Sequence, residues 1–403
     1  MRDERRRRRT GLCALLSCAL LCLYLFTGCA SQQSTAGETQ KEAAAAAAAA
    51  ENVTEETTAG PAEASAEAAA EPAAEETFRA VDPAEAVIGI CIDHAEEDEE
   101  DEDPEDREFP AALRKALESR GFAADRILMA ENSDEPDKMA AAVRGLLDGG
   151  ADLLIVEPGD DEMSQAEADA AVRNVCGIAM EAHVPVIFVQ QAPTPEEQAR
   201  WAAMEQPATY VGAAFDARGT VQALLTETLG TKACDHDGDG TIRYLYVTQE
   251  GTAQDMLPAA YAAGLKERKI QAESKGTLRD GESLEADLQA ALGQHGKSLE
   301  MIVCSDDDLA EDILETVREA GRNPGKDILI LGAGAEEDLL QEIVGGAAAG
   351  TVYFDSVTES AEIAAAAVKL CALEVPASVV LDPVPVTASN AQEIRDYRNT
   401  FLK

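Results

Sequence analysis

Residues 152–190 read DLLIVEPGDDEMSQAEADAAVRNVCGIAMEAHVPVIFVQ. One apolar run (152–157) leads through an amphipathic stretch (165–182) to a second apolar run (185–190). Short, continuous apolar runs predict strands that are covered on both faces, and the stretch between them predicts a helix. A strand, a helix and a strand in this order predict a parallel strand pair joined by a helical crossover.

The same alternation extends in both directions along the chain. It spans residues 84–390, which is too long for one sheet of five or six strands, so the sequence predicts an α/β protein with two lobes. Ligands of such sheets bind at the carboxyl ends of the strands. The other predicted strands are AVIGICI (86–92), RYLYVT (243–248), EMIVC (300–304), DILILG (327–332) and TVYF (351–354), and the other predicted helices are Ala111–Gly121, Asp137–Leu147, Leu309–Ala320 and Ser360–Leu373.

The charge of the chain is strongly negative. Its 403 residues include 33 Lys and Arg against 77 Asp and Glu, a formal charge of −44. Such a charge argues against nucleic acid as a partner, because the phosphate backbone would be repelled. Residues 96–106 form an almost purely acidic insert, for which a solvated segment is the plain interpretation.

The N-terminus has the pattern of an export signal. The basic segment RDERRRRR (2–9) precedes an apolar run (11–26), which is short for a spanning helix. The segment LFTGC ending at Cys29 resembles a bacterial lipobox. We therefore expect a lipoprotein signal peptide (1–28) and lipidation of Cys29, with an uncleaved membrane anchor as the alternative. Either places the remaining chain outside the cytoplasm and attached to a membrane.

Residues 29–80 are predicted to be a disordered tether, because they are rich in Ala and Glu and have no apolar periodicity. The cysteines beyond Cys29 are far apart and form no CxxC pair, so they indicate buried free thiols, although a single disulfide stays open. They are Cys91, Cys176, Cys234, Cys304 and Cys371.

A short acidic loop, DHDGDGTIR (235–243), has the spacing of half a calcium-binding loop. Asp235, Asp237 and Asp239 stand at positions 1, 3 and 5, with Gly at position 6 and the carbonyl of Thr241 at position 7. Position 9 is Arg243, which offers no oxygen, so a further carboxylate must come from elsewhere. An acidic turn without metal is the alternative.

This combination resembles the galactose/glucose-binding proteins, which are class I periplasmic-type binding proteins of ABC sugar uptake systems. The resemblance implies two lobes, each a parallel sheet flanked by helices, with a three-strand hinge, and a structural calcium ion whose loop is completed by Glu300. The family has glutamine where this chain has Arg243. The aligned segments are IGICI (88–92), VPVIFVQ (184–190), YVG (210–212), DHDGDG (235–240), EMIVCSDD (300–307) and GTVYFD (350–355).

The resemblance also implies a ligand cleft between the lobes, and there the chain departs from the family. Several of the family's sugar-binding side chains are replaced, at Ala253, Ala259, Gly334, Phe354 and Gly281–Glu282. The fold and role therefore transfer better than the sugar does, and a group of acids would also suit a cationic ligand. The predicted ligand-binding residues are Asp93, Phe109, Gln190, Asp255 and Asp306.

The same resemblance implies how the chain is divided. The first lobe is expected to comprise 84–190 and 356–383, and the second 192–354 and 385–403. The hinge strands are expected near 190–192, 354–358 and 382–386.

Two functions from different classes remain open. The first is a lipid-anchored, monomeric solute-binding protein that captures a small ligand, with a galactose- or glucose-like sugar favoured, and delivers it to an ABC permease. The second is a sensor or interaction lipoprotein with the same fold and a repurposed acidic cleft. An enzyme is not expected, because none of His94, His183, His236 and His295 stands beside a nucleophile or in a metal-binding spacing.

Overall fold

The computed structural model describes residues 77–93, 108–159, 163–214, 216–249 and 253–400. The predicted signal peptide, Cys29, the tether up to residue 76 and the acidic insert 96–106 lie outside these residues. Residues 77–80, predicted as the end of the disordered tether, contact the first lobe instead, because Arg79 pairs with Asp152 at 2.7 Å and the Phe78 ring packs against His183. In the described part of the chain, no helix is long and apolar enough to cross a membrane.

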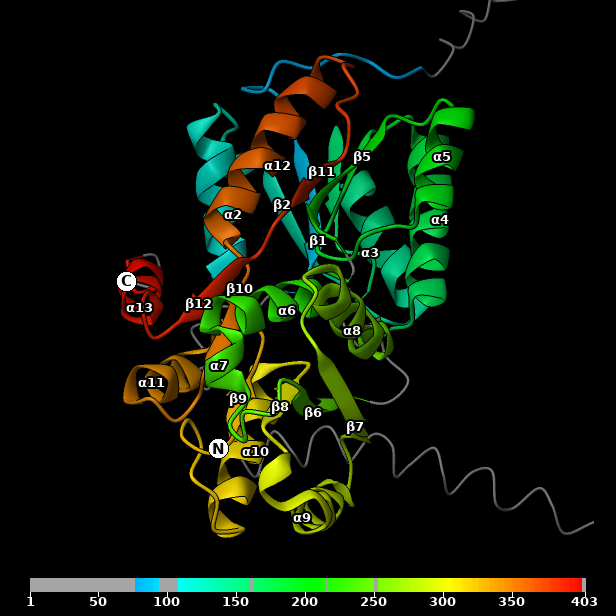
Figure 1. Cartoon of the computed structure of the whole chain (residues 1–403). Coiled ribbons are helices and arrows are strands. Elements are labelled where there is room, and N and C mark those ends of the chain that lie inside the picture. Colours follow the sequence, from blue (N-terminus) through cyan, green and yellow to red (C-terminus); the bar gives the residue numbers. More distant parts are fainter. Residues whose placement is uncertain (1–76, 94–107, 160–162, 215, 250–252, 401–403) are drawn as a thin grey trace, which may run out of the picture. The chain divides into compact units, whose positions relative to one another are not determined.

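The first lobe contains a parallel sheet of six strands in the order β11-β5-β4-β3-β1-β2 (Figure 1). Successive side chains point to opposite faces, so Leu153 and Ile155 face one core while Leu154 and Val156 face the other. The strands are β1 (Ile88–Ile92), β2 (Ile127–Glu131), β3 (Leu153–Val156), β4 (Val186–Val189), β5 (Ala208–Ala213) and β11 (Val379–Leu381).

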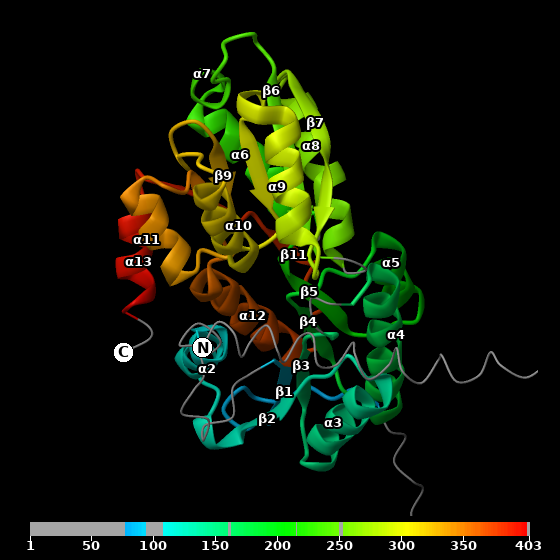
Figure 2. The same ribbon diagram turned by 90° about the horizontal axis from the view of Figure 1, so that it is seen from below.

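Helices cover both faces of this sheet. The helices α2 and α12 share one apolar core with it and lie side by side in Figure 1 and Figure 2, whereas α3 and α4 share the other core. The helices are α2 (Glu108–Ser119), α3 (Pro136–Asp148), α4 (Gln165–Ala182), α5 (Pro195–Ala203) and α12 (Ser356–Cys371), with a 3-10 turn at Ala124–Arg126.

The helix predicted at 165–182 has the same bounds in the structure, and local contacts explain both ends. Ser164 accepts the backbone N–H of Glu167, whose carboxylate accepts the N–H of Ser164, which forms a capping box. At the other end His183 takes a left-handed conformation with φ of 55°. One face of α4 is buried in the same core as β3 and β4, which completes the strand–helix–strand unit that the opening segment predicted.

The second lobe contains another six-stranded sheet, in the order β12-β10-β9-β8-β6-β7, in which only the β10–β12 pair is antiparallel. Helices α9, α10 and α11 share the core on one face, and α6 and α8 share the core on the other. The strands are β6 (Ile242–Thr248), β7 (Ala272–Arg279), β8 (Met301–Cys304), β9 (Leu329–Leu331), β10 (Gly350–Tyr353) and β12 (Val384–Thr387).

The remaining elements of the second lobe are helical. They are α6 (Ala217–Leu229), α7 (Thr231–Cys234), α8 (Leu257–Glu267), α9 (Leu284–His295), α10 (Asp307–Glu319), α11 (Glu337–Gly345) and α13 (Ala391–Arg398), with 3-10 turns at Ala253–Met256 and Gly296–Ser298.

The first crossing between the lobes differs from the predicted one. After β4 the chain returns through α5, and β5 pairs in parallel with β4, with Val186 beside Ala208. Residues 192–213 therefore belong to the first lobe, and the crossing follows β5 rather than residues 190–192. The other two crossings lead from β10 to α12 and from β11 to β12.

The cysteines of the described chain are buried free thiols, as predicted. Desolvation raises the pKa of Cys91, Cys176 and Cys234 to about 12 each. These side chains therefore stay protonated and act as small apolar groups of the core.

Candidate functional site

The predicted ligand residues follow the carboxyl ends of strands in both lobes. Asp93 follows β1 and Gln190 follows β4 in the first lobe, while Asp255 follows β6 and Asp306 follows β8 in the second. Parallel strands end at one edge of their sheet, so each lobe presents its polar loops on a single edge. This is the edge at which a ligand of an α/β sheet is expected.

On the first lobe, Asp93 is exposed and its backbone N–H donates to the Glu157 carboxylate at 2.9 Å. Glu157 follows β3, so two acids stand together at neighbouring strand ends. Phe109 lies in the first turn of α2, where it is half-buried against the first-lobe core. Its ring is therefore positioned by packing, in contrast to the exposed Asp93.

Gln190 has a left-handed backbone with φ of 61°, and its side-chain amide lies 3.5 Å from Glu359 of α12. Glu359 is only 6% exposed, and its Oε1 has no hydrogen-bond partner among the described residues. Burial raises the pKa of Glu359 to about 7, and a hydrogen bond from the backbone of Gln190 acts in the opposite direction. The sequence did not single out this carboxyl group.

On the second lobe, Asp255 forms a hydrogen-bonded ion pair with Arg279, the last residue of β7. Arg279 also donates to the Gln249 carbonyl at 3.2 Å. Both charged side chains are about half exposed, so the pair remains open to solvent and to a ligand. Sequence reasoning missed Arg279 because the polar strand that carries it was not predicted.

Asp306 caps α10, since its carboxylate accepts the Leu309 N–H at 2.8 Å and the Ser305 hydroxyl at 3.0 Å. Desolvation raises its pKa to about 6, while these hydrogen bonds and the positive charge of Arg218 act in the opposite direction. The guanidinium of Arg218 lies 5.5 Å from the centre of the Phe354 ring. An acid, a base and an aromatic ring thus meet on this lobe.

Arg218 was also missed, although its position carried a signal. It stands in the first turn of α6, directly after the strand that contains the YVG segment (210–212). Ligand residues are expected after the carboxyl ends of strands, and Arg218 was missed because residues 208–213 were not predicted to form a strand.

A buried ion pair links the two lobes beside Phe109. Arg398 of α13 donates to the Glu108 carboxylate of α2 at 2.7 Å, and Tyr353 of β10 donates to its other oxygen at 3.3 Å. Arg398 also donates to the Ala335 carbonyl. Glu108 is 4% exposed and Arg398 is 8% exposed, so the pair is shielded from water.

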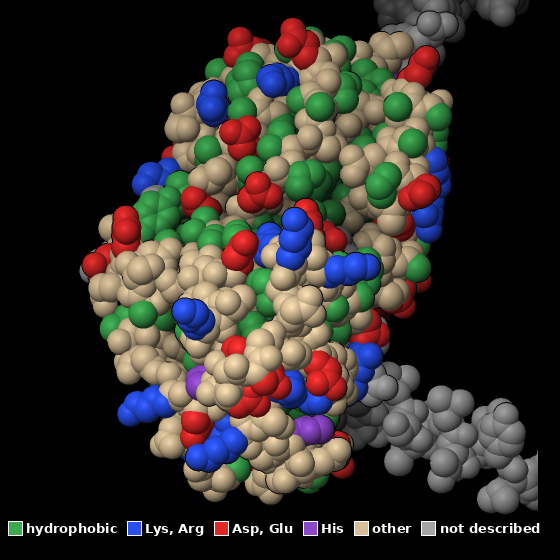
Figure 3. Space-filling view, in the orientation of Figure 1, with side chains coloured by type: hydrophobic (Ala, Val, Ile, Leu, Met, Phe, Trp, Pro, Cys, Tyr) green, Lys and Arg blue, Asp and Glu red, His purple; other side chains and the backbone are tan. Residues whose placement is uncertain are grey.

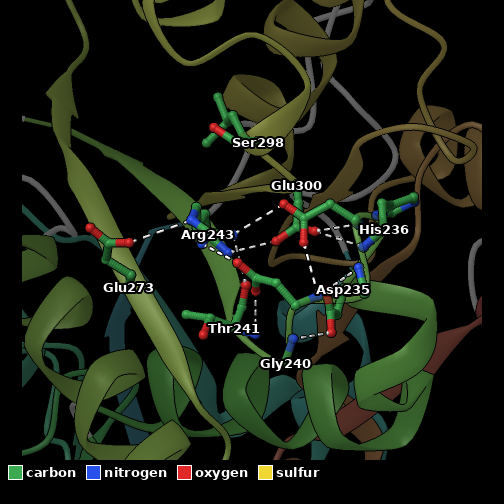
Figure 4. A network of polar contacts seen from close by, with 12 residues as sticks. Asp235, His236, Gly240, Thr241, Arg243, Glu273, Ser298 and Glu300 are labelled. Carbon is green, nitrogen blue, oxygen red and sulfur yellow. Dashed lines mark hydrogen bonds and ion pairs between the residues drawn. The ribbon is translucent and has the colours of Figure 1, made fainter.

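The acidic loop 235–243 follows α7 and runs into the start of β6, and Figure 4 shows Asp235, Thr241 and Arg243 of this loop near Glu300. The three aspartates of the loop come close together. Their nearest carboxylate oxygens all lie within 4.8 Å of one another. Gly238 and Gly240 have φ of 74° and 91°, which allows the chain to turn sharply between the carboxylates. Each aspartate also accepts a backbone N–H within the loop, as in Asx turns.

Two observations bear on whether this loop suits calcium. Glu300 uses both carboxylate oxygens for backbone groups, accepting the N–H of His236 at 2.6 Å, Asp237 at 3.2 Å and Arg243 at 2.9 Å. The guanidinium of Arg243 forms ion pairs with Asp237 and Asp239. Arg243 therefore supplies a positive charge within the loop. Calcium binding stays a prediction, with the predicted ligands Asp235, Asp237, Asp239, Thr241 and Glu300.

Both signs of charge are interspersed on the face of the molecule seen in Figure 3. The ion pairs described above follow the same pattern, because every second-lobe acid predicted for the cleft has an arginine near it. The described second-lobe edge is thus polar and charge-matched.

The family model for the periplasmic binding protein domain matches residues 107–374. No curated protein sequence matches the chain. Among solved structures, it is similar to a periplasmic ribose ABC transporter protein from Conexibacter woesei, with a TM-score of 0.60 and 17% identity over 80% of this chain and 97% of that one.

Two further structures are similar at the same level. One is a Mycobacterium smegmatis protein in complex with β-D-fucofuranose, with a TM-score of 0.58 and 18% identity over 79% of this chain and 96% of that one. The other is an ABC transporter solute-binding protein from Bacillus halodurans with bound myo-inositol, with a TM-score of 0.54 and 17% identity over 80% and 99%. These matches confirm the predicted two-lobed α/β fold.

Proposed function

The chain belongs to the periplasmic binding protein domain family, and from that premise we propose that it captures a sugar or cyclic polyol between its lobes for an ABC permease. Its role is then binding rather than catalysis. The three similar structures named above carry ribose, fucofuranose and myo-inositol in their descriptions, which supports a polyhydroxy ligand. A galactose- or glucose-like sugar is one member of that class.

The observation that carries this proposal is the charge matching on the second lobe. Asp255 is ion-paired with Arg279, and the positive charge of Arg218 opposes in part the rise that desolvation causes in the pKa of Asp306. Alternating donors and acceptors bind neighbouring hydroxyl groups well, because each hydroxyl both donates and accepts. The half-buried Phe354, next to Arg218, offers an apolar face for the C–H side of a ring.

The described histidines support a binding role. The ring of His183 packs edge-on against Phe78, with centroids 5.5 Å apart, at the end of α4. His236 donates its backbone N–H to Glu300 in the acidic loop. His295 ends α9, and all three described histidines precede the start of a strand (β4, β6 or β8) rather than follow a carboxyl end.

We propose that the protein is held at the outer face of the cell membrane by a lipid on Cys29. The basic and apolar leader and the lipobox-like segment that ends at Cys29 support this location. The predicted tether up to residue 76 would let the lobes reach a permease, and a monomer suffices for that delivery.

A sensor or interaction protein with a cationic ligand is the second candidate. The observation in its favour is the pair of acids Asp93 and Glu157 at neighbouring strand ends of the first lobe. The acidic insert 96–106 follows Asp93 in the sequence. The two candidates therefore differ in the charge of the ligand that they expect.

Isothermal titration of the full chain separates the candidates. We expect myo-inositol, ribose, allose, galactose or glucose to bind, and Asp306→Ala to weaken that binding by roughly 10–100-fold, since a hydrogen-bonded charged group contributes about 1.5–3 kcal/mol. The exposed Asp125, far along the chain from any strand end of the site, supplies the matched control Asp125→Ala, which should bind like wild type.

If amines bind and polyols do not, the second candidate, a protein with a cationic ligand, is favoured. No binding at all, by a chain that melts cooperatively, would favour the sensor role. Because Asp306 caps α10, the melting temperature of Asp306→Ala must be measured in parallel, so that a loss of affinity is separated from a loss of fold.

A further inference from the structure

The acidic loop contains a guanidinium where its sequence predicts a metal ion. Arg243 is only 18% exposed in its side chain, and its Nη1 lies 3.3 Å from Asp237 Oδ2. Its Nη2 pairs with Asp239 Oδ2, and Nη1 also lies 3.4 Å from the Thr241 carbonyl oxygen. Figure 4 shows Arg243 directed into the loop, toward these oxygens.

These oxygens are the ones that the spacing of the loop assigns to calcium. Asp237, Asp239 and Thr241 occupy positions 3, 5 and 7 of the calcium-loop pattern. One side chain from position 9 of the same loop thus contacts the middle three of the predicted ligands. A water molecule or glutamine at that position would instead have added an oxygen to the ion.

The two remaining predicted ligands are committed to backbone groups. Asp235 accepts the N–H of Gly238 and the N–H of Gly240, each at 2.8 Å. Glu300 is fully buried and accepts three backbone N–H groups. Both carboxylates therefore have partners that satisfy them within the fold, without a cation between them.

The chemistry of the two cations explains why they compete. Calcium takes about 6–8 oxygen ligands at about 2.3–2.6 Å, and an N–H donor cannot coordinate it. A guanidinium is planar, always charged, and offers five N–H donors to acceptors around its edge. An oxygen that accepts from Arg243 cannot also face a calcium ion at that distance, since two positive charges would be brought together.

We propose that the Arg243 guanidinium takes the place of calcium in this loop, so that the second lobe folds and binds without the metal. A second contact anchors the guanidinium from outside the loop, because Arg243 Nε lies 3.5 Å from Glu273 on β7. The loop, the start of β6 and the edge strand β7 are thereby joined by one side chain. The replacement of calcium by Arg243 involves the loop alone and does not depend on the identity of the ligand in the cleft.

The loop matters to the site because it joins strands that carry the predicted cleft residues. The backbone N–H of Glu300 donates to the Arg243 carbonyl at 2.9 Å, which aligns the starts of β8 and β6. Asp306 and Asp255 follow the other ends of these two strands. With a covalently attached cation, this alignment is independent of the calcium concentration outside the cell.

Calorimetric titration of the full chain with calcium, and its thermal unfolding in calcium and in EDTA, test the proposal. For wild type we expect no heat of binding and the same melting temperature in both solutions. Arg243→Gln removes the guanidinium and adds an amide oxygen at position 9. We expect this variant to melt roughly 2–4 °C lower in EDTA and to recover in calcium.

Arg318→Gln is the matched control, since Arg318 forms an exposed pair with Glu342 elsewhere on the same lobe. It should melt like wild type with and without calcium. Calcium binding and stabilisation of wild type would overturn the proposal, and that measurement decides even if Arg243→Gln does not fold. A folded Arg243→Gln that ignores calcium would also overturn it, because Arg243 would then not be standing in an ion site.

Discussion

Two buried glutamates, one in each lobe, show how differently a fold treats the same side chain. Glu300 in the second lobe is fully buried, and its two oxygens accept three backbone N–H groups. Glu359 in the first lobe is 6% exposed, but one of its oxygens has no partner among the described residues. Burial is thus nearly equal, while hydrogen bonding is not.

The comparison shows that the partners of a carboxylate, rather than its depth, decide whether its charge is tolerated. A carboxylate that accepts several backbone N–H groups replaces the hydrogen bonds to water that burial removes. A buried carboxylate without enough donors is driven toward the protonated form, and this raises the pKa of Glu359 to about 7. We therefore expect Glu300 to stabilise the fold and Glu359 to weaken it at neutral pH.

The largest effect is expected for Glu300→Ala. It would leave three backbone N–H groups without their acceptor, and unsatisfied buried donors cost about 1–3 kcal/mol each, which suggests a loss of about 3–5 kcal/mol. The free energy of unfolding in urea measures this. A loss below about 1 kcal/mol would show that water replaces the carboxylate readily and would remove the contrast with Glu359.

Glu108 is a third buried glutamate, and its partner is a cation, Arg398, rather than backbone N–H groups. Arg398→Ala would leave Glu108 buried with only the Tyr353 hydroxyl, and the expected loss of unfolding free energy is about 3 kcal/mol. The control on the same helix is Arg395→Ala, because Arg395 pairs with Glu337 near the surface and should cost at most about 1 kcal/mol. Equal losses for the two arginines would mean that burial does not distinguish these pairs.

The smallest effect on the free energy of unfolding is expected for Glu359→Gln, which should stabilise the chain rather than destabilise it. The pKa of Glu359 in the folded chain, about 7, lies above its ordinary value of 4.5, so the folded state binds the more protons between these pH values. Wild type must therefore lose stability as the pH rises through that window. Glu359→Gln does not titrate and should be more stable than wild type by about 1–3 kcal/mol above pH 7, with a flatter profile.

Chemical unfolding at a series of pH values checks this prediction. Glu362→Gln is the control, because Glu362 lies on the same helix but is exposed. It should leave the pH profile of wild type unchanged. A profile for Glu359→Gln that is parallel to that of wild type would show that the charge of Glu359 has found a partner.

Local sequence was sufficient for most of the strands that are buried on both sides, although the buried strand β5 was not predicted. The central strands β1, β3, β4, β6 and β8 are short apolar runs, so their class could be predicted from composition alone. The edge strand β7, AESKGTLR, has mostly exposed side chains and was missed. At the edge of a sheet the strand is held by backbone pairing with one neighbour, and its exposed side chains show no apolar pattern from which the strand could be predicted.

The candidate site divides in the same way. The positions of Asp255 and Asp306 after predicted strands could be read from the sequence, because strand ends and cleft loops are neighbours along the chain. The arginines near these two acids could not be predicted from the sequence. Arg279 comes from the missed strand β7 and Arg218 from α6, and only folding brings them to these acids.

The sequence by itself determined the alternation of strands and helices, the division into two lobes, the buried free thiols and the acidic loop. These follow from periodicity and spacing, which act between residues close in the chain. The tertiary structure decided where the chain first crosses between the lobes and which cation faces Asp237 and Asp239. It decided these because strand pairing and the direction of a charged side chain depend on groups that are distant in sequence and meet only in the folded chain.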